Sequence, residues 1–112
     1  MAKLPRAFQT FQRRYSKVFK AYESLGGVAH ESGPLDAKTR ELVKLGMAIG
    51  GRLEGAVRSH AHRALEVGAT PREIEHVVLL AITTTGFPTA VAAFTWIEQL
   101  LGSRKRTRRK VH

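Results

Sequence analysis

The chain has 112 residues, a formal net charge of +10 and no cysteine. This length fits one domain, and the lack of cysteine excludes disulfides, thiolate metal ligands and thiol redox chemistry. No segment approaches the roughly 20 apolar residues of a membrane span. Arg6, Gln9 and the run Gln12–Arg14 interrupt the N-terminal segment, so we expect no secretory signal, no membrane partner and a cytoplasmic location.

The positive charge is concentrated at the two ends of the chain. Residues 1–25 carry a net charge of +5, residues 26–103 carry −1 and residues 104–112 carry +6. The last stretch, 103–112, cannot bury enough apolar surface to offset its ordering entropy, so we expect a disordered basic tail. Two roles for this tail remain open. It is either simply solvated or makes weak, non-specific contact with nucleic acid, in which case binding should fall steeply with salt.

The first helix is predicted over residues 6–25, where aromatic residues recur every three or four positions between basic ones. We expect this aromatic face to pack on the core or on another subunit. The alternative is a basic aromatic helix for a membrane or nucleic acid. Gly26-Gly27 should end the helix, and residues 28–35 should form a loop.

Four further helices follow in the same way. The second is predicted over 37–50 with Asp36 as its N-cap, and the third over 53–67, closed by a glycine at the C′ position. The fourth, over 71–84, begins with the capping box Thr70-Pro71-Arg72-Glu73, and the fifth runs from Pro88 to about Leu101.

The predicted fold is therefore all-α, with five helices in a single helical domain over residues 1–102. Helices two to five should be antiparallel neighbours because their connections are short. Helices four and five are apolar on more than one face, which favours an oligomer.

One carboxylate and one imidazole lie on apolar helical faces. Glu41 shares a face with Leu45 and Ala48, and His60 lies at helical spacing from Val57 and Ala64. An unpaired ionisable group in apolar surroundings is costly, so the simplest arrangement is that the two residues pair. Pairs of this kind are common at reactive sites.

The same region resembles a known family. The run LDAKTRELV at residues 35–43 and the run SHAHRALEVGATPREI at residues 59–74 resemble the carboxymuconolactone decarboxylase / alkylhydroperoxidase D family. The resemblance covers roughly residues 34–101. It implies an alkylhydroperoxidase D-like helical bundle that assembles into homo-oligomers, either trimers or hexamers.

The chain departs from the peroxidase branch of that family at its Cys-x-x-Cys motif. Leu53 and Ala56 stand at the two cysteine positions, and Gly55 stands where that branch keeps an additional histidine. Thiol peroxidase chemistry needs both thiols and is excluded. The resemblance implies that Glu41 and His60 are the acid/base partners, with no cofactor and no metal. The implied substrate is a small carboxylated lactone that loses CO2.

Other polar residues nearby carry weaker hypotheses. Arg58 or Arg63 is a candidate for holding a substrate carboxylate, although each also fits an exposed helix arginine. His62 should point to a different face from His60, which argues against a metal site built from both. Glu54 fits either a second carboxylate near His60 or a favourable charge at a helix N-terminus.

Three functions remain open from the sequence. The first is a cofactor-free carboxy-lyase using Glu41 and His60 on a small-molecule substrate. The second is a non-catalytic oligomeric scaffold of the same family. The third is a nucleic-acid-associated protein that uses its basic termini.

Overall fold

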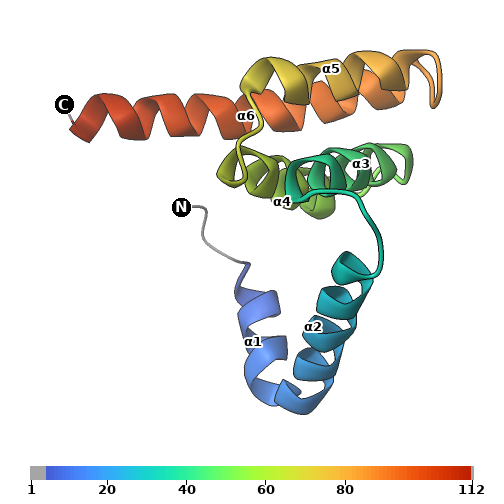
Figure 1. Ribbon diagram of the computed structural model, residues 1–112. Coiled ribbons are helices and arrows are strands. Elements are labelled where there is room, and N and C mark those ends of the chain that lie inside the picture. Colours follow the sequence, from blue (N-terminus) through green and yellow to red (C-terminus); the bar gives the residue numbers. More distant parts are fainter. Residues whose placement is uncertain (1–4, 112) are drawn as a thin grey trace. The chain divides into compact units, whose positions relative to one another are not determined.

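The computed structural model describes the backbone of residues 5–111 and the side chains of residues 5–103. It contains the helices α1 (Arg6–Arg14), α2 (Ser16–Glu31), α3 (Ala37–Gly50), α4 (Glu54–Glu66), α5 (Pro71–Ile82) and α6 (Phe87–Val111) (Figure 1). Residues 5–111 hold no β-strand, which confirms the all-α class. The prediction of five helices was wrong, because six are present over this range.

The chain divides into two compact units, Met1–Pro34 and Leu35–His112, where we expected one domain over 1–102. In the first unit, the helix predicted over 6–25 is interrupted at Tyr15, where the backbone leaves helical geometry (φ −121°, ψ 51°). The break lets Phe8 meet Phe19 edge-on with ring centroids 5.6 Å apart. On one continuous helix these two residues would be separated by roughly 16 Å along the axis.

Helix α2 continues through Gly26 and Gly27 to Glu31, so the expected helix end at these glycines was wrong. Each glycine costs about 1 kcal/mol of helix propensity relative to alanine, which is not enough to end a helix. A glycine that ends a helix adopts positive φ, and neither Gly26 nor Gly27 does. The predicted loop over 28–35 therefore shortens to residues 32–36.

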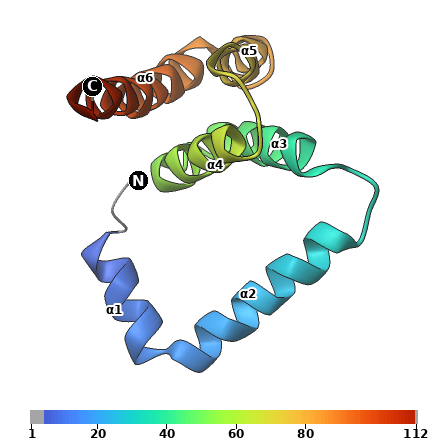
Figure 2. The ribbon, with the colours of Figure 1, turned by 60° about the vertical axis from the view of Figure 1, so that its left-hand side comes forward.

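The second unit consists of α3–α6. Figures 1 and 2 show α3 beside α4 and α5 beside α6, with the first pair stacked on the second. Apolar side chains from all four helices fill the space between them. The residues that are completely buried include Leu45, Ile49, Val57, Ala61, Ala64, Ile74, Ala93 and Ile97.

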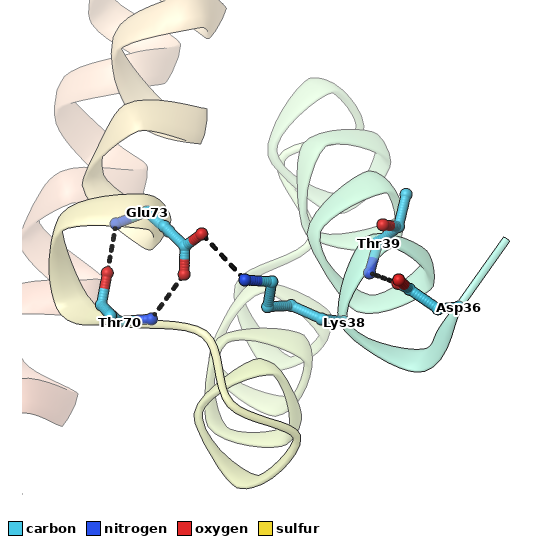
Figure 3. Close-up of polar contacts among 5 residues, drawn as sticks. All are labelled: Asp36, Lys38, Thr39, Thr70 and Glu73. Atoms are coloured by element: carbon cyan, nitrogen blue, oxygen red, sulfur yellow. Dashed lines mark hydrogen bonds and ion pairs between the residues drawn. The ribbon is translucent and has the colours of Figure 1, made fainter.

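Local capping signals place the ends of these helices where the sequence predicted. The Thr39 backbone N–H donates to Asp36 Oδ1 at 2.8 Å, which confirms Asp36 as the N-cap of α3 (Figure 3). Thr70 and Glu73 form both hydrogen bonds of a capping box at the start of α5. Gly68 has φ +103° directly after Val67, the C-cap of α4, as a C′ glycine should.

The α5 cap is also tied to α3. Lys38 Nζ lies 3.0 Å from Glu73 Oε2 (Figure 3). The Glu73 carboxylate therefore accepts a hydrogen bond from the Thr70 backbone N–H at Oε1 and one from Lys38 at Oε2. The Thr70 backbone hydrogen bond, helped by Lys38, holds the pKa of Glu73 below its ordinary value of 4.5. The Thr39 backbone hydrogen bond likewise holds the pKa of Asp36 below 3.8.

These two lowered pKa values predict a loss of stability in acid. Both carboxyls bind protons less readily in the folded chain, so their stabilising contribution is complete above about pH 4.5 and falls as the pH drops through the folded values. We expect the melting temperature to fall between about pH 5 and pH 3, and less steeply in Glu73→Gln than in the wild type. Equal slopes in thermal melts of the two proteins would contradict this role for Glu73.

Helix α6 extends well past its predicted end. It was expected to stop near Leu101 and to be followed by a disordered tail over 103–112, but the helix is described through Val111. Lys and Arg are good helix formers, and cations are favourable near a helix C-terminus. A single glycine at position 102 is therefore tolerated.

The pattern of burial on α5 and α6 was predicted only in part. Ile74, Val78, Ala93 and Ile97 are buried as expected. Leu80, Val91 and Phe94 were expected in the core, but they are 58%, 44% and 41% exposed. A helix that packs on its neighbours with one face leaves such residues at the surface, because an apolar sequence can exceed the width of the contact.

Candidate active site

Among the side chains that the structure describes, Glu41 is the one charged side chain that is buried, with only 7% of its surface exposed. It lies in the first half of α3, on the same face as the completely buried Leu45. A carboxylate in such a position needs a hydrogen-bond donor, because burying an unpaired charge is costly. The structure supplies that donor from the next helix.

His60 on α4 places its Nδ1 atom 2.8 Å from Glu41 Oε1. The histidine side chain is 15% exposed and the glutamate side chain 9% exposed, so little water screens the contact. α3 and α4 are joined by the short connection 51–53 and pack side by side, which brings the two residues together. The structure thus pairs the two residues that the sequence proposed as partners.

The pairing defines the roles of the two imidazole nitrogens. A carboxylate in its ionised form only accepts hydrogen bonds, so in that form of Glu41 the contact is made by the His60 tautomer with the proton on Nδ1. Nε2 is then the nitrogen with which His60 would exchange a proton with a ligand. A carboxylate that fixes the tautomer and the ring orientation is a common companion of a histidine acid or base.

Arg58 is oriented differently from the pair. Its guanidinium lies 3.0 Å from Glu54 Oε2 and also donates to the Trp96 carbonyl and to the Gln99 side chain on α6. Arg58 therefore faces α6, whereas His60 faces α3. The structure does not bring this arginine to the Glu41–His60 pair.

In the described part of the chain, the other polar residues considered from the sequence make no ion pair with Glu41 or His60. Arg63 is exposed in the last turn of α4, and His62 contacts Glu66 on its own helix at 3.5 Å. Glu54 occupies the first turn of α4 and pairs with Arg58, which favours the helix-end interpretation over a second carboxylate near His60. Within the described residues, no group of three or more His, Asp or Glu could hold a metal ion.

Sequence reasoning missed an open groove of about 520 Å³ between α3 and α5. Apolar side chains dominate it, and the lining set contains Thr39, Leu42, Val43, Gly46, Glu73, His76, Val77, Leu80, Ala81, Thr84 and Thr85. Glu41 and His60 do not line it. Adjacent helix residues are turned by about 100°, so Glu41 points about 200° away from Val43 around α3.

No helix among the described residues has an apolar stretch that would reach across a membrane. The second unit is instead an all-helical bundle with a buried carboxylate–imidazole pair between two consecutive helices. The class of protein is therefore an all-helical bundle with a buried acid/base pair, and comparisons with known proteins identify its family.

A family model and a solved structure agree on that class. A family model described as the carboxymuconolactone decarboxylase family matches residues 16–99. The crystal structure of an apo carboxymuconolactone decarboxylase family protein from Legionella pneumophila superposes with a TM-score of 0.71 at 24% identity, covering 84% of this chain and 87% of that chain. At this level of identity, the superposition shows a shared fold.

An uncharacterized protein from Haemophilus influenzae is 41% identical over 59 residues, which are 53% of this chain and 52% of that protein. The match thus spans about half the length of this curated relative. The family model covers most of the chain, and the chain belongs to the carboxymuconolactone decarboxylase family. It is a member without cysteine.

Proposed function

We propose that this protein is a cofactor-free lyase that removes CO2 from a small carboxylated lactone by acid/base catalysis. The observation that carries the proposal is the 2.8 Å contact between His60 Nδ1 and the buried Glu41 carboxylate. Family membership supports the substrate class. The lack of cysteine leaves this pair, rather than a dithiol, as the reactive group.

Decarboxylation requires that one proton be delivered to the ring carbon that loses CO2. When the bond between a ring carbon and the substrate carboxylate breaks, CO2 leaves and its bonding electron pair remains on the lactone. His60, in its imidazolium form, donates a proton from Nε2 to that carbon. Glu41 accepts the hydrogen bond from Nδ1 throughout, which stabilises the imidazolium and keeps the ring oriented. Solvent then returns the proton to Nε2.

Access to the pair is consistent with a small ligand. The His60 side chain keeps 15% of its surface exposed, whereas Glu41 is almost covered. A substrate would therefore meet the imidazole first, with the carboxylate behind it. Arg63, exposed on the same helix, remains a candidate for the substrate carboxylate. Arg58 is the weaker candidate of the two, because Glu54 and α6 already occupy its guanidinium.

One observation favours a second candidate function, that of a non-catalytic helical scaffold. The groove of about 520 Å³ lies on the opposite side of α3 from Glu41, and apolar side chains dominate its lining. In a scaffold, the Glu41–His60 contact would serve only to join α3 to α4. The two candidates differ in whether the pair is needed for turnover or for stability.

The direct test is decarboxylation of carboxymuconolactone by the purified wild-type chain, followed as CO2 release and as loss of the lactone. His62→Gln is the matched control, since it changes a histidine two residues from His60 that does not contact Glu41. We expect turnover in both proteins, with rates within about twofold of each other. Lactone loss no faster than in protein-free buffer would exclude this substrate and favour the scaffold.

A further inference from the structure

Helix α6 continues beyond the core that it helps to form. Leu101 is the last buried residue among the described side chains of α6, and the backbone stays helical through Val111. The segment 102–111, which we call the α6 extension, therefore adds about 15 Å of helix beyond the core. Figure 1 shows this red end of α6 reaching past the ends of α3, α4 and α5.

The α6 extension is strongly cationic. Six of the seven residues at 104–110 are lysine or arginine, and the sequence has no aspartate or glutamate after Glu98. Residues four apart are neighbours on a helix, and three such pairs are cation with cation, at positions 104 and 108, 105 and 109, and 106 and 110. Like charges at this spacing destabilise a helix, so a polyanion that neutralised them would stabilise the extension.

The positions of the six cations indicate the shape of the partner. At the helical rotation per residue they are spread over about 240° of the circumference, and Thr107 and Val111 lie in the remaining sector. A flat membrane surface faces only one side of such a helix. A membrane-bound helix also needs a face of large apolar residues, which the sequence at 104–111 lacks. A groove with phosphates along both walls matches this distribution of charge.

We propose that the α6 extension binds double-helical DNA by lying in the major groove, with its cations directed to the phosphates on both sides. The major groove of B-form DNA is about 12 Å wide and admits an α-helix, whose diameter with side chains is about 10–12 Å. The major groove of A-form RNA is deep and narrow, which disfavours the same mode of binding. Contacts to phosphates carry no sequence information, so binding is independent of sequence and falls with salt.

The first measurement is the dissociation constant of the full-length chain for a mixed-sequence DNA duplex, by fluorescence anisotropy at several salt concentrations. Six neutralised phosphates would give a slope of log K against log salt of about −5. Replacing all six cations of the extension by glutamine, which is also a good helix former, should raise the dissociation constant at low salt at least about 100-fold and flatten this slope.

The matched control replaces the six lysines and arginines of residues 1–25 by glutamine, which removes the same charge from the other end of the chain. It should raise the dissociation constant less than about threefold, because its cations lie outside the proposed contact. Equal losses in the two variants would show that net charge, rather than the extension, determines binding, and would overturn the proposal. Circular dichroism would check that both variants keep the helices of the bundle.

The second measurement tests whether the extension binds as a helix. Thr107→Pro keeps all six cations but interrupts the helix, and Thr107→Ala is its control, because alanine favours the helix. We expect the proline variant to bind the duplex at least about tenfold more weakly than the alanine variant, because an interrupted helix no longer directs its cations to both walls of the groove. Equal affinities would overturn binding as a groove-bound helix.

The third measurement compares ligands at the same salt concentration. We expect the wild-type chain to bind an RNA duplex, and vesicles containing anionic phospholipid, at least about tenfold more weakly than the DNA duplex. RNA or vesicles bound as tightly as DNA would overturn the assignment to the DNA major groove. Absence of DNA binding at about 50 mM salt, where phosphate contacts are strong, would overturn the proposal as a whole.

Discussion

Replacing His60 by glutamine should lower kcat for lactone decarboxylation by about 10²- to 10⁴-fold, the usual contribution of a general acid or base. The glutamine amide can still donate a hydrogen bond to Glu41, so the buried carboxylate keeps a partner. It cannot deliver a proton at neutral pH. The loss should therefore fall on the chemical step, with helix content and melting temperature close to those of the wild type.

The variant His62→Gln distinguishes proton donation by His60 from a loss of activity caused by any histidine substitution in α4. His62 lies two residues further along the helix and contacts Glu66, and its side chain is partly exposed like that of His60. A comparable loss of kcat in both variants would show that the helix, rather than the Glu41–His60 pair, limits turnover. A His60→Gln enzyme with wild-type kcat would remove His60 from the mechanism.

The largest expected effect on stability comes from Ile97→Ala. Ile97 on α6 is completely buried in the core shared by α3–α6. Removing its branched side chain leaves a cavity and should lower the free energy of unfolding by about 2–5 kcal/mol, measured by urea denaturation. For a small domain this loss is a large fraction of the total stability.

Leu79→Ala is the control for that substitution. Leu79 lies on α5 with 60% of its surface exposed, so the same loss of aliphatic surface should cost no more than about 0.5 kcal/mol. Similar costs for the two variants would mean that Leu79 is covered in solution. That result would place an interface on this face of α5 and contradict the burial described for the single chain.

The parts of the fold that depend on neighbouring residues could be predicted from the sequence. The Asp36 cap and the capping box of Thr70 and Glu73 each involve groups three residues apart, so their geometry follows from the residue types. The pairing of Glu41 with His60 was also predictable, because both residues lie on apolar helical faces and a buried charge requires a partner.

Features that depend on contacts between distant residues could not be predicted. The helix break at Tyr15 accompanies the packing of Phe8 against Phe19, which are 11 positions apart in the sequence. No residue type near Tyr15 signals this break. The attachment of Arg58 to α6 and the groove between α3 and α5 depend on which helices are neighbours. The helix ends predicted at Gly26-Gly27 and near Leu101 were wrong, because a helix can continue through a glycine at a cost of about 1 kcal/mol.

The most direct test of the proposed mechanism is a double-mutant cycle on kcat with wild type, Glu41→Gln, His60→Gln and the combined variant. If Glu41 acts only through His60, the combined variant should be no slower than His60→Gln alone, because the two residues work as a unit. Losses of the two single variants that multiply in the combined variant would contradict this coupling. So would a Glu41→Gln enzyme as fast as the wild type.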